Sequence, residues 1–263
     1  MPDAHATPGR PDLPIDDALP QIVAAVTAHG CLVLTAETGA GKTTRVPPAL
    51  LDSIKGRVLM LQPRRVAARA AARRVADENG WRLGHEVGYQ VRFERKISAA
   101  TRIEILTEGI LTRRLQADPF LDGVGAVILD EFHERSLHGD LALALLADVR
   151  ASARPNLHLI VMSATLDAAP LTRFLGDAPW IDVPGRSHPV TITYAATSPS
   201  LRDRPGRFHG VMGQRSHAER LGRGLAERVE VSVRATIHDE PAGGDILVFL
   251  PGVAEIARAE GVL

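Results

Sequence analysis

The chain has 263 residues, 45% of them hydrophobic, and its 31 basic residues balance 31 acidic ones, so the overall charge indicates no polyanionic partner. No stretch approaches the roughly 18 apolar residues of a membrane span, and residues 1–14 lack the apolar core of a signal peptide. The single Cys31 excludes an internal disulfide, and together these features predict a soluble, cytoplasmic protein without a membrane partner.

Short apolar runs alternate with helical patterns as far as about residue 185. A first helix is predicted from Asp16 to His29, and a helix shortened by Pro47-Pro48 follows the first strand. The predicted strands span 31–36, 57–62, 87–93, 102–107, 126–129 and 157–162, and the other predicted helices span 66–78, 108–117, 136–149 and 168–175. This alternation predicts an α/β fold, with a mostly parallel sheet covered by helices on both faces.

The pattern changes after Pro184-Gly185. An exposed strand is predicted at 190–195, a flexible linker or insertion at 197–217, a helix at 218–235, a buried strand at 246–250 and a helix from Val253. The last strand and the last helix cannot form a core alone. The predicted domains are a flexible N-terminus (1–14), a first domain (15–185), a linker or insertion (186–217) and the truncated start of a second domain (218–263).

The segment from Ala36 to Thr44 has the composition of a phosphate-binding loop and joins a predicted strand to a predicted helix. Gly39 and Gly41 allow backbone N–H groups and the helix N-terminus to converge on an anion. Lys42 can then reach the terminal phosphates of a nucleotide. The predicted nucleotide-binding residues are Glu37, Thr38, Gly39, Ala40, Gly41, Lys42, Thr43 and Thr44, and the Thr43 hydroxyl is also a candidate ligand of Mg²⁺.

Two carboxylates, Asp130 and Glu131, directly follow a buried strand. A carboxylate in this position can hold Mg²⁺, and its neighbour can orient and deprotonate an attacking water. A zinc site is excluded, because His133 and His138 are five positions apart and the metalloprotease helix places its histidines four apart.

Polar and basic residues follow three other predicted strands. Ser163 and Thr165 can bond to the carboxylate motif and pass on the state of the nucleotide. The residues suited to contacts with phosphodiesters are Arg64, Arg65, Thr107, Glu108, Gly109 and Arg113. With 4% aromatic residues, no platform for base stacking is evident. Because ligands of parallel sheets bind at the carboxyl ends of strands, all these segments are expected at one edge.

Taken in order, these motifs resemble the DEAH-box helicases of superfamily 2. The matching segments are 37–44, 62–68, 88–94, 107–109, 130–133 and 163–165, and 247–252 resembles the block that opens the second RecA-like domain. Phe132, which stands where the family's name has Ala, followed by Glu134-Arg135, is similar to the bacterial HrpB branch.

The resemblance implies a RecA-like P-loop NTPase domain and the start of a second RecA-like domain. It implies an enzyme that hydrolyses ATP or another NTP with Mg²⁺, moves on single strands and opens RNA duplexes. The implied catalytic residues are Lys42, Asp130, Glu131 and His133, and the implied magnesium ligands are Thr43 and Asp130.

The resemblance also assigns roles in coupling and in nucleic-acid contact. Ser163 and Thr165 would couple hydrolysis to movement of the strand, and His133 would contact the second domain. Arg64, Arg65 and Thr107 would touch the nucleic-acid backbone.

The family's late motifs, which carry arginine fingers, are absent from the sequence. We therefore expect the N-terminal fragment of a helicase, which binds RNA, hydrolyses ATP poorly alone and needs the missing C-terminal half. Two alternatives stay open. One is a nucleotide-responsive nucleic-acid-binding module without turnover, and the other is a P-loop translocase acting on DNA.

Overall fold

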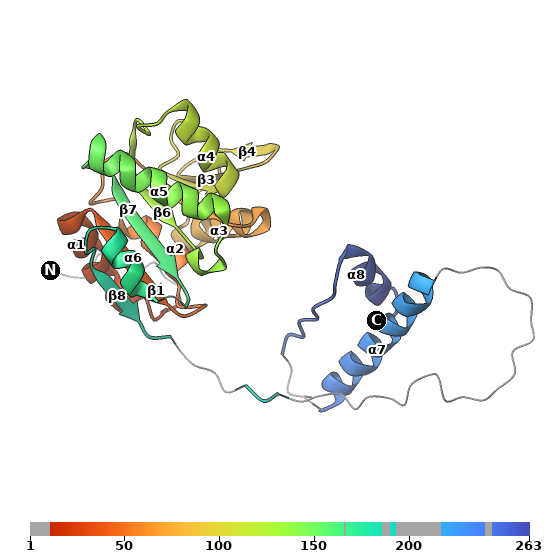
Figure 1. Cartoon of the computed structure of the whole chain (residues 1–263). Coiled ribbons are helices and arrows are strands. Elements are labelled where there is room, and N and C mark those ends of the chain that lie inside the picture. Colours follow the sequence, from red (N-terminus) through yellow and green to blue (C-terminus); the bar gives the residue numbers. More distant parts are fainter. Residues whose placement is uncertain (1–10, 166, 186–189, 193–216, 240–243) are drawn as a thin grey trace, which may run out of the picture. The chain divides into compact units, whose positions relative to one another are not determined.

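The computed structural model describes residues 11–165, 167–185, 190–192, 217–239 and 244–263, which belong to two compact units (Figure 1). The first unit spans Met1–His188 and the second spans Pro189–Leu263. The predicted first domain falls within the first unit, and most of the predicted linker lies outside the described residues. No helix in the described ranges has the length and apolar character needed to cross a membrane.

The first unit is built on one sheet of eight strands. The strands are β1 (Cys31–Ala36), β2 (Arg57–Gln62), β3 (Val87–Val91), β4 (Glu94–Lys96), β5 (Ile103–Thr107), β6 (Val124–Leu129), β7 (His158–Ser163) and β8 (Trp180–Val183). Their order across the sheet is β4-β3-β5-β2-β6-β7-β1-β8. All neighbours run parallel except β3 and β4. The predicted α/β fold with a mostly parallel sheet is confirmed.

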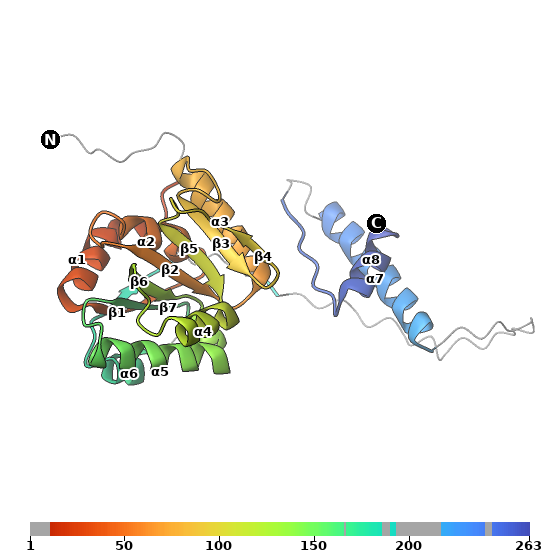
Figure 2. The same cartoon turned by 90° about the horizontal axis from the view of Figure 1, so that it is seen from above.

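Helices cover both faces of this sheet (Figure 2). One face carries α1 (Leu19–His29), α2 (Lys42–Ala49) and α3 (Arg65–Asn79), and the other carries α4 (Glu108–Ala117), α5 (Leu137–Ser152) and α6 (Ala168–Phe174). Alternate strand residues enter the two cores. On β1, Leu32 and Leu34 join the core under α1 to α3, whereas Val33 joins the core under α4 to α6. Burial on both faces explains why the strands are almost continuously apolar.

Local capping explains where several helices begin and end. The Ser136 hydroxyl accepts from the Gly139 N–H at 2.9 Å and begins α5. Gly80 has a φ of 65° and ends α3 in the left-handed conformation that glycine adopts readily. Pro47 and Pro48 lie within α2, which is only eight residues long, as the double proline predicts.

Two short strands at the edges of the sheet were not predicted. The strand predicted to reach residue 93 ends at Val91, because the chain reverses through Arg92 and Phe93 into the antiparallel β4. The three residues of β4 are all exposed, so they lack the apolar signal that marks a buried strand. The four-residue β8 alternates exposed and buried positions at the opposite edge, beside β1.

The second unit contains α7 (His217–Asp239) and α8 (Val253–Glu260). The prediction of a buried strand at 246–250 is wrong, because these residues form no strand, and Leu247 and Phe249 are 77% and 85% exposed. A strand needs a neighbour for its N–H and C=O groups, and the described part of this unit offers only helices. The strand predicted at 190–195 is likewise not seen at 190–192, and its remainder lies outside the described residues.

Candidate active site

The loop between β1 and α2 has the backbone geometry that an anion site requires. Gly39 and Gly41 have φ angles of 84° and 97°, which L side chains rarely adopt. A Cβ atom on Gly41 would also lie only 2.6 Å from Leu13 Cδ1. Lys42 begins α2, so the helix N-terminus opens onto the loop. This geometry suits the binding of phosphate groups.

Chain segments on both sides hold this loop in place. The Ile15 N–H donates to the Ala40 carbonyl at 3.1 Å, and both side chains are buried. On the other side Glu37 packs so closely on Gly185 that any added Cβ would overlap its carboxylate. The loop therefore contacts Ile15, which precedes it in the sequence, and Gly185, which follows it far along the chain.

Arg45 on α2 is a wholly buried cation behind the loop. Its Nε lies 3.4 Å from Asp16 Oδ1, its Nη1 lies 3.2 Å from Glu78 Oε2, and its Nη2 donates to the Pro11 carbonyl at 2.7 Å. These contacts tie α2 to α3 and to the N-terminal segment. The sequence did not indicate this role, because an arginine in a helical pattern usually faces solvent.

The structure brings the phosphate loop and the acidic motif together. The strands β1 and β6 are not neighbours, since β7 lies between them, but all three end at the same edge. There the Thr43 hydroxyl donates to Asp130 Oδ2 at 2.6 Å, and Lys42 Nζ lies 4.0 Å from Glu131 Oε1. Lys42 Nζ also donates to the Ala36 carbonyl at 3.1 Å. The predicted meeting of the two motifs at one edge is therefore observed.

Asp130 is the most buried carboxylate of this group. Burial raises its pKa to about 6, and the hydrogen bond from Thr43 opposes the shift without cancelling it. The amide of Gln62 donates to the same oxygen at 2.5 Å, and the Glu131 N–H donates to Oδ1 at 2.9 Å. Sequence reasoning assigned no role to Gln62, although its position at the end of β2 was a signal that it faces this edge.

Glu131 and His133 lie beside the end of β7. Glu131 has a φ of 53°, a left-handed conformation that is uncommon outside glycine, and it precedes a short 3₁₀ turn, Phe132–Glu134. His133 Nδ1 lies 3.4 Å from Glu131 Oε2 and accepts from the Ala164 N–H at 3.3 Å. This backbone contact links the acidic motif to the segment after β7.

Ser163 and Thr165 were expected to bond to the acidic motif through their hydroxyls, and no described hydrogen bond joins either hydroxyl to that motif. The Ser163 hydroxyl is buried and donates to the Thr165 carbonyl at 3.2 Å, within its own turn. Among the described contacts, the link to His133 runs through the main chain of Ala164 instead. Sequence patterns do not reveal such main-chain contacts, because any residue type can make them.

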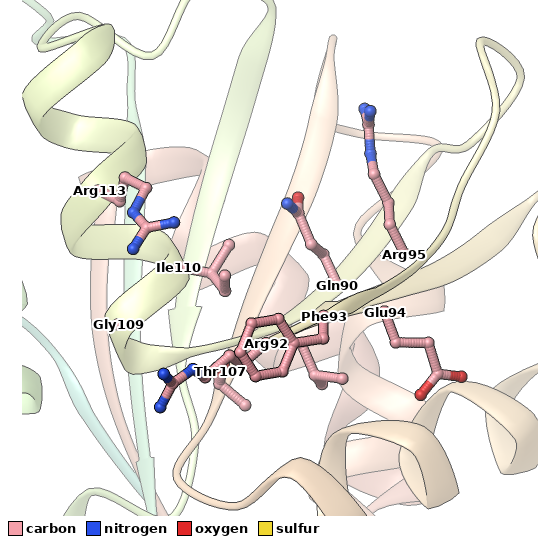
Figure 3. A pocket seen from close by; sticks show the side chains of 10 residues that line it. Gln90, Arg92, Phe93, Glu94, Arg95, Thr107, Gly109, Ile110 and Arg113 are labelled. Atoms are coloured by element: carbon pink, nitrogen blue, oxygen red, sulfur yellow. The ribbon is translucent and has the colours of Figure 1, made fainter.

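A cavity of about 690 Å³ lies beside the start of α4 and contains part of the predicted nucleic-acid site (Figure 3). Thr107, Gly109 and Arg113 line it on one side. The hairpin of β3 and β4 also lines it, with Arg92 in the turn and Arg95 on β4, which, like Arg113, carry positive charge. The cavity therefore joins predicted phosphate-contacting residues to a basic hairpin that the sequence had not singled out for this role.

The other predicted nucleic-acid residues lie outside this cavity. Arg64 pairs with Glu134 at 3.1 Å, near the acidic motif, and Arg65 begins α3. The Glu108 carboxylate is directed toward Gly139 at the start of α5. The structure thus separates the six residues into two groups along the same edge of the sheet.

No platform for base stacking was evident from the sequence, and the structure shows one aromatic ring exposed beside the cavity. Phe93 is 89% exposed at the turn between β3 and β4, and the Arg92 guanidinium carbon lies 4.7 Å from the centre of its ring. The signal available in the sequence was an aromatic residue between arginines at 92 and 95. The overall aromatic content of 4% does not show where an individual ring such as Phe93 lies.

Comparisons with known proteins agree on one kind of protein. The sequence model of the DEAD/DEAH box helicases matches residues 17–174. The chain is 41% identical over 250 residues to ATP-dependent RNA helicase HrpB of Escherichia coli K12, covering 94% of this chain and 28% of that protein. It is 37% identical over 256 residues to probable ATP-dependent RNA helicase DHX40 of Pongo abelii, covering 95% and 31% respectively.

Solved structures give the same result. The fold matches a crystal structure of Escherichia coli DEAH/RHA helicase HrpB with a TM-score of 0.76 and 39% identity, over 95% of this chain and 29% of that one. A crystal structure of the E. coli DExH-box NTPase HrpB matches with a TM-score of 0.69 and 39% identity, over 98% and 29% respectively. The chain thus spans less than a third of the length of these relatives.

Proposed function

Since the chain belongs to the DEAD/DEAH box helicase family and has its RecA-like fold, we propose that it is the ATP-binding part of an ATP-dependent RNA helicase. The observation that carries the proposal is the meeting of Lys42 and Thr43 with Asp130 and Glu131 at one edge of the sheet. An amine, a hydroxyl and two carboxylates in this arrangement are the groups that phosphoryl transfer from a nucleotide requires.

The residues of the site fit a magnesium–nucleotide complex. Thr43 and Asp130 supply two oxygen atoms 2.6 Å apart, and oxygen is the donor that Mg²⁺ prefers. Asp130 is buried with a raised pKa, a cost that a bound cation would relieve. When bound, Mg²⁺ neutralises charge on the phosphates. The loop N–H groups and Lys42 would bind the phosphates themselves.

Glu131 is the group that we propose to handle the attacking water. Its carboxylate can accept a proton from water and direct the oxygen at the terminal phosphorus. The Lys42 ammonium lies 4.0 Å from this carboxylate. His133 Nδ1 lies near Glu131 Oε2 and accepts from the Ala164 N–H, which supports a role for His133 in coupling hydrolysis to movement. The same role for Ser163 and Thr165 rests on the family resemblance alone.

Single-stranded RNA is the proposed substrate of the cavity beside α4. Thr107, Gly109 and Arg113 on one wall, with Arg92 and Arg95 on the other, form a positive surface that suits a phosphodiester backbone. The relatives are named as RNA helicases, which favours RNA over DNA. A cytoplasmic location completes the proposal, and the single buried thiol of Cys31 suits a reducing compartment.

The proposed domain organisation follows from the relatives' greater length. Residues 15–185 would form the ATP-binding domain, 186–217 a linker or insertion, and 218–263 the start of a second RecA-like domain. Because the relatives extend far beyond the matched segment, full activity would need parts that this segment lacks. We therefore expect the chain alone to bind nucleotide and to hydrolyse it slowly.

The decisive experiment measures ATP hydrolysis with and without single-stranded RNA, in the chain and in its Glu131→Gln variant. The variant should lose hydrolysis by about 10²- to 10⁴-fold and keep its affinity for nucleotide, because only the proton acceptor is removed. Glu227→Gln, at an exposed position on α7, is the matched control and should leave the rate unchanged. Equal rates in Glu131→Gln and the unmodified chain would contradict the proposed mechanism.

A further inference from the structure

Resting on the proposed binding of RNA, we propose that Phe93 stacks on one base of the bound strand while neighbouring arginines hold its phosphates. The site is the wall of the cavity formed by the turn between β3 and β4 (Figure 3). Its ligand is an unpaired nucleobase of single-stranded RNA.

The first observation is the exposure of the ring. Phe93 is 89% exposed, more than any other large hydrophobic side chain in the described residues. Burying a phenyl ring normally contributes about 1.5–3 kcal/mol, a contribution that the exposed Phe93 does not make to folding. Phe93 also has a φ of 69°, which directs the chain through a tight reversal at that point. The ring is therefore presented at the tip of the turn and does not belong to either core.

The second observation is that the turn is rigidly held. Glu94 accepts hydrogen bonds from the Tyr89 hydroxyl, on β3, and from Arg69 Nε, on α3, the latter at 2.7 Å. Gly88 lies so close to the main chain of Lys96 that no Cβ would fit between the strands. The platform is thus fixed before a ligand arrives, which lowers the entropy cost of binding.

The third observation is the charge around the ring. Figure 3 shows Phe93 near the middle of the cavity wall, with Arg113 and Arg95 on either side of it. Arg92 lies over the ring at 4.7 Å, and the lining includes one acidic residue, Glu94, whose charge is met by Arg69. Three arginines against one neutralised carboxylate favour a polyanion as the occupant.

These features fit a base better than a protein side chain. The Arg92 guanidinium lies over the Phe93 ring, an arrangement that allows a base, the ring and the guanidinium to stack on one another. Sites that bind single strands combine such stacking with a positively charged groove for the phosphates. Thr107 and Gly109 line the same cavity, and no atom lies within 4 Å of a Cβ added to Gly109, which leaves space there for the sugar–phosphate chain. The ring would then contact the flat face that every base has, so binding should not depend on the RNA sequence.

The test is fluorescence anisotropy on the full chain with two labelled RNA oligonucleotides of equal length, one with bases and one abasic. Phe93→Ala should raise the Kd for the oligonucleotide with bases by roughly 5- to 150-fold and leave the Kd for the abasic one within about twofold. Phe93→Trp should restore affinity, and its fluorescence should be quenched by the oligonucleotide with bases. Phe174→Ala, at another exposed ring on α6, is the matched control and should change neither Kd.

The outcomes separate this inference from the function on which it rests. Unchanged affinity of Phe93→Ala for the oligonucleotide with bases would overturn the stacking role and leave Phe93 as a surface for a protein partner. An equal loss with the abasic oligonucleotide would also overturn it, because the ring would then serve only the shape of the turn. Failure of the unmodified chain to bind either oligonucleotide at low salt would instead contradict the proposed binding of RNA.

Discussion

At the scale of single residues, Asp130 has a charge state set by its surroundings. Burial raises its pKa from 3.8 to about 6, so the folded protein holds the proton more tightly than the unfolded chain does. Stability from this group is therefore complete below about pH 4 and is lost as the pH rises through 6. At neutral pH the folded protein carries the full cost of a buried charge, which magnesium binding would offset.

The buried charge of Asp130 predicts how Asp130→Asn changes stability in the presence of a metal chelator. At pH 7.5 the variant should be more stable to urea than the unmodified protein, by up to about 3 kcal/mol, because the buried charge is gone. At pH 4 the two proteins should be equally stable, since Asp130 is then largely protonated. The prediction fails if the difference in unfolding free energy does not depend on pH.

Arg45 is a second residue whose contribution to stability depends on its surroundings. Its guanidinium is wholly buried between Asp16 and Glu78. Arg45→Met should therefore lower the free energy of unfolding by about 3–5 kcal/mol, because Asp16 and Glu78 both lose their contact with this buried cation. Urea midpoints of Arg45→Met, Glu78→Gln and the double variant check the cause. The double variant should lose less than the sum of the single losses, and strict additivity would argue against a buried ion pair.

At the scale of elements, continuous apolar runs identified the central strands, with each predicted end within two residues of the observed one. They could do so because each of these strands is buried on both faces, so every residue carries the signal. The same signal failed at β4 and β8, which are short edge strands with exposed residues. It also failed at 246–250, where apolar residues lie exposed and form no strand.

Close packing between β6 and the segment before β2 leads to a prediction at this scale. An added Cβ on Gly125 would overlap the Lys55 carbonyl, beside the irregular register at Arg57 and Val58. Gly125→Ala should therefore lower the thermal midpoint, with a loss of about 1–3 kcal/mol. Gly109→Ala is the control, because no atom lies within 4 Å of its added Cβ, and alanine favours helices by about 0.5–1 kcal/mol. Equal midpoints for the two variants would contradict this packing argument.

At the scale of the molecule, both hydrophobic cores lie entirely between Ile15 and Val183. A chain of residues 1–188 should consequently unfold in one cooperative transition, with most of the near-ultraviolet circular dichroism of the full chain. A chain of residues 189–263 should show helical signal that melts gradually, because the buried residues described there are only Ala226, Val229 and Ala259. A sharp transition in the shorter chain would contradict this division of stability.

The sequence by itself determined the α/β class, the phosphate loop, the acidic motif and the family, because each depends on residues that are close together in the chain. Gly39, Gly41 and Lys42 act within one turn of backbone, and the apolar period of a strand is equally local. The common edge of the sheet could also be inferred, since parallel strands end on one side.

Only the tertiary structure decided which side chains meet at that edge and which stand apart. The bond from Thr43 to Asp130 depends on β7 lying between β1 and β6, and the burial of Arg45 depends on where the N-terminal segment and α3 come to lie. Phe93 is exposed beside the cavity because β4 folds back on β3. These features are contacts between segments that are far apart in the sequence, and the local pattern of apolar residues does not predict them.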